Sequence, residues 1–176
     1  VCTLGPNEND YELMKKLAEK MDVARFNFSH GSHQEHLGRL ALLKQARKDT
    51  GREIAALLDT KGPEIRTGEL EDHKKVMLEA GNEIVLTIDE CIGNASRVYI
   101  NYNGLNEDLK FGIEEGFDFV AASFVRNAET IEQIRALIDE AGSSMKIIAK
   151  IESQEGLDNL DAIIADMELL SQQGKT

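Results

Sequence analysis

The stretch VARFNFSHG, at residues 23–31, has the pattern of a strand that ends in a loop. Side chains of an extended chain point to opposite faces at successive positions. One face therefore carries a cation, an amide and a hydroxyl, and the other is apolar (Arg25, Asn27 and Ser29 against Ala24, Phe26 and Phe28). A solvated edge strand also alternates. These polar groups, followed by His30 and Gly31, favour a face that holds an anion beside a metal ion.

Helical patterns lie on both sides of this stretch. Apolar residues at helical spacing predict a helix over residues 10–21, with Asn9 or Asp10 as its N-cap. Ser32 and Glu35 have the S-x-x-E spacing of a capping box and predict a second helix that ends near residue 50. A continuous apolar run at residues 54–58, ending in Asp59, is typical of a strand buried in a parallel sheet.

The alternation of strands and helices is then interrupted. Residues 68–105 contain no amphipathic helix and predict a small all-β insertion, with strands at residues 75–78, 83–88 and 97–102. Beyond it, helices at residues 107–115, 128–141 and 156–165 alternate with strands at residues 117–124 and 146–151. This alternation indicates a parallel α/β sheet, open or closed.

Composition narrows the function classes. The 176 residues include 32 acidic and 20 basic side chains, a net charge of -12, which argues against a nucleic-acid or anionic-membrane surface. No apolar run approaches the roughly 18 residues of a membrane-spanning helix. Cys2 and Cys91 form no CxxC pair, and no signal peptide is present, so we expect reduced thiols in a cytoplasmic protein. The apolar first residues lead us to expect further chain upstream.

Polar residues gather where the predicted strands end, which is where parallel α/β proteins bind ligands. Lys150 and Glu152 share a face of the last strand. The carboxylate could hold a divalent cation while the lysine stabilises a negative oxygen; an ion pair inside a barrel is the alternative. Asp59 is a second candidate metal ligand, or else an N-cap. Ser123 closes the strand predicted at residues 117–124.

Two further patterns suggest a metal site and a phosphate loop, but neither interpretation holds. His30, His33 and His36 recur every three residues, but the capping box explains the local sequence and no Cys partner follows. We therefore expect His33 and His36 to lie on a helix surface. The run at residues 61–63 lacks the G-x-x-x-x-G-K-[ST] pattern, so a Walker-type phosphate loop is excluded.

Five segments resemble the pyruvate kinase family, in order and at sensible spacings: VCTLGP (1–6), VARFNFSHG (23–31), LDTKGPEIRTG (58–68), KFGIEEGFDFVAASFV (110–125) and IIAKIESQEGLDN (147–159). The resemblance covers about residues 1–165. It implies an α/β fold, a (β/α)8 TIM barrel with about five of its eight strands present. Residues 1–67 and 106–176 would be the barrel domain, with residues 166–176 unassigned. Residues 68–105 would be the remnant of a β-barrel lid domain inserted after the third strand.

The resemblance also implies an activity, the transfer of a phosphoryl group from phosphoenolpyruvate to ADP in glycolysis, giving pyruvate and ATP. It implies Mg²⁺ (or Mn²⁺) and K⁺ as cofactors, a cytoplasmic homotetramer when full length, and no nucleic-acid or membrane partner. Arg25 and Lys150 would bind substrate and act in catalysis, and Glu152 would hold Mg²⁺. The nucleotide would meet Asn27, His30 and Arg66, and K⁺ would meet Asn27, Ser29, Asp59 and Thr60. Glu64 matches the residue that accompanies potassium dependence.

The sequence departs from the family pattern in three places. The insertion is much shorter and lacks the lid lysine that contacts ATP. The A-R-G-D-L-G-like segment, which carries the second metal carboxylate, does not follow residue 165, and the last three strands and the C-terminal domain are missing. We expect a fragment, or ordered segments joined across gaps, that is inactive as written. The alternatives are a metal-dependent pyruvate or enolate lyase or aldolase on the same barrel, and a non-catalytic fragment that binds a full subunit.

Overall fold

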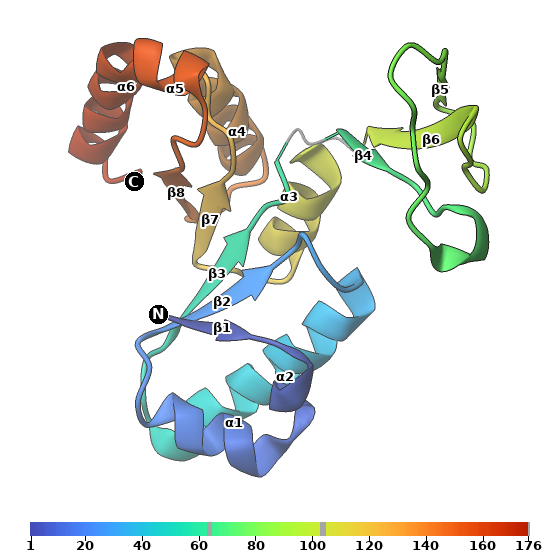
Figure 1. Ribbon diagram of the computed structural model, residues 1–176. Coiled ribbons are helices and arrows are strands. Elements are labelled where there is room, and N and C mark those ends of the chain that lie inside the picture. Colours follow the sequence, from blue (N-terminus) through green and yellow to red (C-terminus); the bar gives the residue numbers. More distant parts are fainter. Residues whose placement is uncertain (63–64, 103–104, 176) are drawn as a thin grey trace. The chain divides into compact units, whose positions relative to one another are not determined.

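A computed structural model describes residues 1–62, 65–102 and 105–175. The chain divides into two compact units. One unit consists of Val1–Gly62 and Leu105–Thr176, and the other is Pro63–Gly104. The larger unit contains a five-stranded sheet and the smaller unit a three-stranded sheet (Figure 1).

The sheet of the larger unit keeps its strands in chain order. It consists of β1 (Cys2–Leu4), β2 (Val23–Asn27), β3 (Ala55–Asp59), β7 (Phe119–Ala122) and β8 (Lys146–Ala149), all parallel and in the order β1-β2-β3-β7-β8. Because strand–helix–strand crossovers are right-handed, consecutive order places the connecting helices on one face of the sheet. A (β/α)8 barrel has this arrangement and a doubly wound sheet does not. The predicted partial barrel is confirmed.

The helices of the first half begin at predicted capping residues, and α2 ends where predicted, whereas α1 ends at Ala18, three residues before the predicted end at residue 21. After η1 (Pro6–Asn9), α1 (Tyr11–Ala18) begins at Asp10, whose carboxylate accepts the N–H of Leu13 at 2.8 Å. The capping box of α2 (His33–Thr50) is present, since Glu35 Oε2 accepts the Ser32 N–H at 2.7 Å and Ser32 Oγ accepts the Glu35 N–H at 3.3 Å. Gly51, with φ 66°, ends the helix in the left-handed region that favours glycine.

The second half contains α3 (Leu105–Glu114), α4 (Ala128–Glu140), α5 (Gln154–Asp158) and α6 (Leu160–Gln172). The single helix predicted at residues 156–165 is thus two helices that meet at Asn159. The side chain of Asn159 donates to the carbonyl of Arg126 at 2.9 Å, which holds the break in place. The unassigned residues after 165 continue α6.

The smaller unit contains β4 (Ile65–Thr67), β5 (Val85–Thr87) and β6 (Arg97–Tyr102), in the order β4-β6-β5, with the short helix η2 (Glu71–His73). Strands predicted at residues 83–88 and 97–102 are confirmed. The strand predicted at residues 75–78 is wrong, because this segment is irregular and Met77 is 83% exposed. A short apolar run forms a strand only when a neighbour pairs with it.

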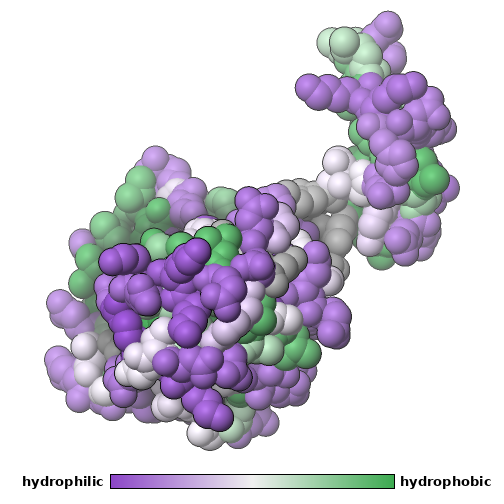
Figure 2. Space-filling model, turned by 90° about the horizontal axis from the view of Figure 1, so that it is seen from below, coloured by the Kyte–Doolittle hydropathy of each residue, from purple (hydrophilic) through white to green (hydrophobic). Residues whose placement is uncertain are grey.

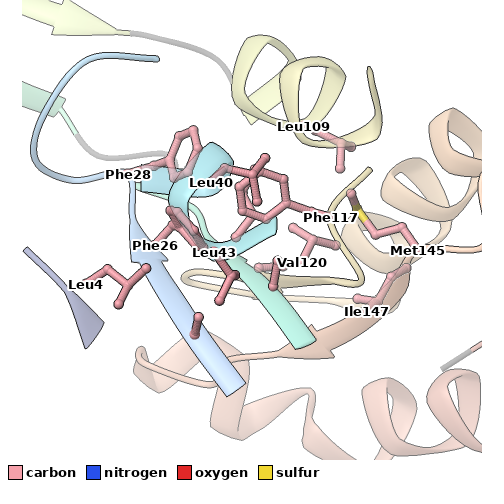
Figure 3. Close-up of a cluster of buried hydrophobic side chains, with 14 of the residues drawn as sticks. Leu4, Phe26, Phe28, Leu40, Leu43, Leu109, Phe117, Val120, Met145 and Ile147 are labelled. Atoms are coloured by element: carbon pink, nitrogen blue, oxygen red, sulfur yellow. The ribbon is translucent and has the colours of Figure 1, made fainter. Parts of the chain in front are cut away.

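The core of the larger unit lies between the sheet and its helices (Figure 3). Alternate strand residues meet side chains of α2 and α3, and all are buried (Leu4, Phe26, Leu58, Val120 and Ile147 against Leu40, Leu43 and Leu109). Ala24, Phe26 and Phe28 are buried, which confirms the apolar face predicted for residues 23–31. Arg25 and Asp59 have the opposite parity on their strands, so they lie on the face turned away from the helices.

The surface in Figure 2 is largely hydrophilic on the visible face. Apolar atoms gather at its left edge, the side on which Figure 1 places α6. Ile164 and Leu169 of this helix are 45% and 54% exposed. In the part of the chain that the structure describes, no helix is both long and apolar enough to cross a membrane.

Candidate functional site

A buried carboxylate joins two cations at the carboxyl ends of the strands. The side chain of Asp59, the last residue of β3, is 5% exposed. Its Oδ2 accepts from Arg25 Nε at 2.7 Å, and its Oδ1 lies 2.9 Å from Lys150 Nζ. Arg25 is on β2 and Lys150 follows β8, so three strands contribute. A carboxylate removed from water requires such partners, because its desolvation costs several kcal/mol.

Glu152 extends this row of charges toward solvent. Its Oε1 lies 3.4 Å from Lys150 Nζ, and its Oε2 accepts the backbone N–H of Phe124 at 3.1 Å. Phe124 has φ 54°, a left-handed conformation that non-glycine residues rarely adopt. Lys150 and Glu152 therefore form an ion pair, the alternative that the sequence left open, at the carboxyl end of β8.

The residues predicted to hold K⁺ lie on neighbouring strand ends. Asn27 is in register with Asp59, and its side-chain oxygen accepts the N–H of Ser29 at 3.1 Å. Thr60 is buried, and its hydroxyl accepts the N–H of Ser123 at 3.1 Å. The four residues offer only oxygen ligands, the chemistry that a hard cation requires. The donor set fits such an ion.

The carboxylates fit a magnesium ion that arrives with a phosphorylated ligand. Among the described residues, no group of three or more His, Cys, Asp and Glu side chains could hold a metal ion. Mg²⁺ is usually bound through one or two carboxylates, with water and substrate phosphates completing its shell. Glu152 suits that role better than the role of ligand in a site made by protein alone.

His36 is buried, so the prediction that it lies on the helix surface is wrong. It is 2% exposed, and its ring stacks on Phe28 with centroids 4.2 Å apart. It precedes Leu40 and Leu43 by four and seven residues, which places it on the apolar stripe of α2. The polar residue type hid this signal. The surface prediction for His33 is confirmed, with its side chain 44% exposed.

The nucleotide candidates are only partly described. His30 is exposed, and its carbonyl oxygen lies 2.9 Å from Nε2 of His36. Arg66 lies on β4 in the smaller unit, and its side chain is outside the described part of the chain, as is the whole of Glu64. Most of the predicted site residues thus lie together at the carboxyl ends of the strands: Arg25, Asp59, Lys150 and Glu152 form the row of charges, with Asn27, Ser29 and Thr60 at the same strand ends. The side-chain positions of Arg66 and Glu64 stay predictions.

Two groups at the site were not predicted. Thr3 Oγ1 accepts from Arg25 Nη1 at 2.8 Å, and the N–H of Phe124 binds Glu152. Thr3 is the register partner of Arg25, so aligning the predicted strands could have found it. No residue pattern signals the Phe124 backbone.

A second group of cations lines a cleft of about 1090 Å³ at the amino ends of the strands. Its charges are already paired in part, since Arg47 lies 3.0 Å from Asp118 and Arg52 lies 3.0 Å from Asp22. The cations at the carboxyl ends are paired as well, so pairing does not separate the two places. The carboxyl ends remain the candidate site because parallel α/β barrels bind their ligands there.

Burial of His36 makes the stability of the fold depend on pH. Burial lowers the pKa of its ring; the hydrogen bond to His30 and the charge of Glu35 oppose this, and Arg39 and His33 add to it. As pH falls through the unfolded-state pKa of about 6.5, the unfolded chain binds a proton that the folded ring does not. We expect unfolding free energy to fall by at most about 1.4 kcal/mol per pH unit from this group. Urea unfolding measured between about pH 7.5 and 5.5 should show that the free energy of unfolding changes less with pH in His36→Gln than in the unmodified chain. An equal dependence on pH in the two chains would contradict this.

Gly62 allows the loop after β3 to approach the end of β7. Its φ is 72°, and a Cβ there would lie 2.8 Å from the Cβ of Ser123. We expect Gly62→Ala to lower the free energy of unfolding by about 2–3 kcal/mol, from backbone strain and overpacking together. Gly51→Ala is the matched control, because its φ is 66° and nothing lies within 4 Å; it should cost about 1 kcal/mol. Equal losses in urea unfolding would exclude the steric part.

Consecutive parallel strands, helices on one face and a charged site at the carboxyl ends define the class of this domain. It is part of a (β/α)8 barrel with a site suited to an anion and cations.

Comparisons with known proteins give the family. The sequence model of the family described as "Pyruvate kinase, barrel domain" matches residues 1–108 and 105–171. The pyruvate kinase of Bacillus licheniformis is 33% identical over 229 residues, covering 93% of this chain and 39% of that protein. That of Staphylococcus aureus strain MRSA252 is 32% identical over 228 residues, with the same coverage. The chain belongs to the pyruvate kinase family.

The chain spans about two fifths of the length of these relatives. Since 93% of the 176 residues is about 164 residues, the Bacillus protein is about 65 residues longer across the matched 229. The family match also changes from one segment to the next at residues 105–108, where the smaller unit ends. Both facts agree with a shortened insertion.

Proposed function

We propose that this chain carries the phosphoenolpyruvate- and cation-binding half of a phosphotransferase site. In the full-length protein, the site would transfer the phosphoryl group of phosphoenolpyruvate to ADP and release pyruvate and ATP. The row of charges Arg25–Asp59–Lys150–Glu152 is the observation that carries this proposal. Membership of the pyruvate kinase family supports it.

The balance of charges in this row suggests why bound cations would help a phosphorylated anion to bind. Two cations and two carboxylates sum to no net charge, and Asp59 engages both cations. A phosphorylated anion would gain little from a neutral cluster. A monovalent cation among the oxygen donors of the strand ends, and Mg²⁺ at Glu152, would leave Arg25 and Lys150 with charge to spare for phosphate. Phosphoryl transfer depends mainly on such positive charge.

Each side chain has a role that its chemistry suits. The planar guanidinium of Arg25 would bind phosphate oxygens through two N–H groups. The ammonium of Lys150 would stabilise the enolate oxygen that forms when the phosphoryl group leaves. When bound, Mg²⁺ would neutralise charge on the phosphoryl oxygens. Asn27, His30 and Arg66 are proposed contacts to the nucleotide.

We extend the proposal to the whole protein by family membership. We expect a cytoplasmic homotetramer that uses K⁺ and Mg²⁺ or Mn²⁺ and binds neither nucleic acid nor membrane. Residues 68–105 would be the remnant of the lid domain. The net charge of -12 supports the absence of a nucleic-acid partner.

A specificity titration tests the proposal. Calorimetry of the 176-residue chain in K⁺ and Mg²⁺ should show phosphoenolpyruvate binding at least about tenfold more tightly than pyruvate or inorganic phosphate, because only phosphoenolpyruvate meets Arg25 and Lys150 together. An enolate lyase or aldolase, which would use only Lys150 and Glu152, would bind pyruvate at least as well. Binding of none of the three would refute the proposal and favour a non-catalytic fragment.

A turnover assay separates the reaction classes further. We expect the 176-residue chain to form no pyruvate from phosphoenolpyruvate and ADP in a lactate-dehydrogenase-coupled assay, because no group of three or more His, Cys, Asp and Glu side chains in the described residues completes a metal site at Glu152. Release of pyruvate without ADP would mean that water accepts the phosphoryl group, a phosphatase reaction, and would contradict transfer to ADP.

A further inference from the structure

We propose that His36 is a positioning residue that fixes the loop after β2, and with it the direction in which the His30 ring is presented to a nucleotide. The nucleotide part of this inference rests on the proposed function. The loop part rests on contacts within the larger unit and stands without it.

The tautomer of His36 follows from its hydrogen bond. Its Nε2 lies 2.9 Å from the carbonyl oxygen of His30. A carbonyl can only accept, so Nε2 carries a proton. Burial lowers the pKa of the ring and favours its neutral form, with a bare Nδ1. Nδ1 is buried without a hydrogen-bonding partner among the described residues. Burying an unpaired nitrogen costs free energy. Within the described ranges, the His30 carbonyl is the one hydrogen-bonding partner of this ring.

Phe26 of β2 and Phe28, which follows this strand, fix the plane of the His36 ring. Phe28 stacks on it with an interplanar angle of 14°, and Phe26 meets it edge-on at 70°. The ring therefore sits on a rigid helix and against a rigid strand, which aims Nε2 at one place. A hydrogen bond from a side chain held in this way restricts the positions that the loop can adopt.

The loop itself leaves little freedom to His30. Its N–H donates to the carbonyl of Asn27 at 3.2 Å, while its carbonyl is held by His36. Gly31 has φ 82°, and a Cβ there would lie 3.2 Å from Glu35 Oε2 and 3.5 Å from His36 Nε2. The chain thus passes closely over the first turn of α2. Because both polar groups of the His30 backbone are bound, only its side-chain torsions remain free.

The consequence reaches the cation donors as well. Asn27 supplies a carbonyl to the His30 N–H and a side-chain oxygen to Ser29. A loop released by His36 would move the His30 ring together with these oxygen donors. The proposed nucleotide and cation contacts therefore depend on one buried histidine that would touch neither ligand.

Two substitutions separate the effect of the Nε2–H donor of His36 from the effect of its aromatic ring. His36→Phe keeps an aromatic ring against Phe28 but removes the N–H, whereas His36→Gln places an amide N–H near the position of Nε2 and removes the ring. We expect the His30 amide to exchange with solvent about tenfold faster in His36→Phe, and within about threefold of the unmodified chain in His36→Gln. Amides in the core of β3 report on global stability and serve as the internal control.

Three outcomes would overturn the positioning role. One is unchanged exchange at residues 29–31 in His36→Phe, and another is equal loss in both variants after correction for global stability. The third needs no variant: ¹⁵N shifts of the unmodified chain should show the Nε2–H tautomer of His36, and an Nδ1–H tautomer would exclude the hydrogen bond.

A nucleotide titration tests the remaining part. Mg²⁺-ADP should shift the His30 ring resonances of the unmodified chain, with about fivefold weaker binding in His36→Phe and near-normal binding in His36→Gln. If the unmodified chain shows no ADP shift while the exchange results hold, the proposed nucleotide contact fails and His36 stands as the positioning residue of the loop alone.

Discussion

Replacing Asp59 by Asn should lower the free energy of unfolding by about 3–4 kcal/mol. The carboxylate is 5% exposed and bound by both Arg25 and Lys150, whose side chains are 32% and 28% exposed. Without the carboxylate, both cations lose their attraction to Asp59 and only the repulsion between the two positive charges remains. Solvent reaches both cations, which keeps the loss below that of a fully buried triad. Urea unfolding followed by circular dichroism measures it.

Asp22→Asn is the matched control for this loss. Asp22 pairs with Arg52 at 3.0 Å, but its side chain is 86% exposed. An exposed pair contributes about 0–1 kcal/mol, so this substitution should change stability little. If Asp59→Asn cost no more than Asp22→Asn, the carboxylate would not be the anchor of the charge row.

Replacing Arg25 by Met should weaken phosphoenolpyruvate binding by about 100-fold. Hydrogen bonds to charged groups contribute about 1.5–3 kcal/mol, and the guanidinium can offer two of them to one phosphate. Arg25→Lys keeps the positive charge but not the paired N–H donors of the guanidinium, and it should bind phosphoenolpyruvate about tenfold more weakly than the unmodified chain. Calorimetry in K⁺ and Mg²⁺ measures both, with near-ultraviolet circular dichroism to show that the variants are folded.

Lys48→Met removes the same charge from an exposed position on α2 that lines the cleft at the amino ends, and is the control both for net charge and for binding at that cleft. It should change the affinity less than about twofold, because exposed charges are screened by salt. An Arg25→Met chain that binds phosphoenolpyruvate as tightly as the Lys48→Met chain would remove Arg25 from the proposed site.

Features that depend on a few neighbouring residues were predictable from the sequence. The capping box at Ser32 acts over three residues, and the alternation at residues 23–31 follows from strand geometry alone. The gathering of Arg25, Asp59 and Lys150 was also predictable, because parallel strands bring their carboxyl ends together.

Features that depend on distant partners were not predictable. The segment at residues 75–78 has strand-like composition, but strand formation depends on a neighbour that the sequence does not name. The burial of His36 follows from helix packing against Phe28, and the N–H of Phe124 reaches Glu152 only through an unusual backbone angle. The pairing of one carboxylate with two cations likewise emerges only when three strands align.

Locating the phosphoenolpyruvate site in the chain tests most directly whether the carboxyl ends of the strands bind this ligand. The ligand should be titrated into ¹⁵N-labelled chain in K⁺ and Mg²⁺, with the Arg Nε–H and backbone amide resonances followed together. We expect shifts at Arg25 Nε–H and at the amides of residues 27–30, 59–60 and 150–152, at the carboxyl ends of the strands. Shifts confined to the cation-lined cleft at the amino ends, around Arg47 and Arg52, or no shifts at all, would contradict it.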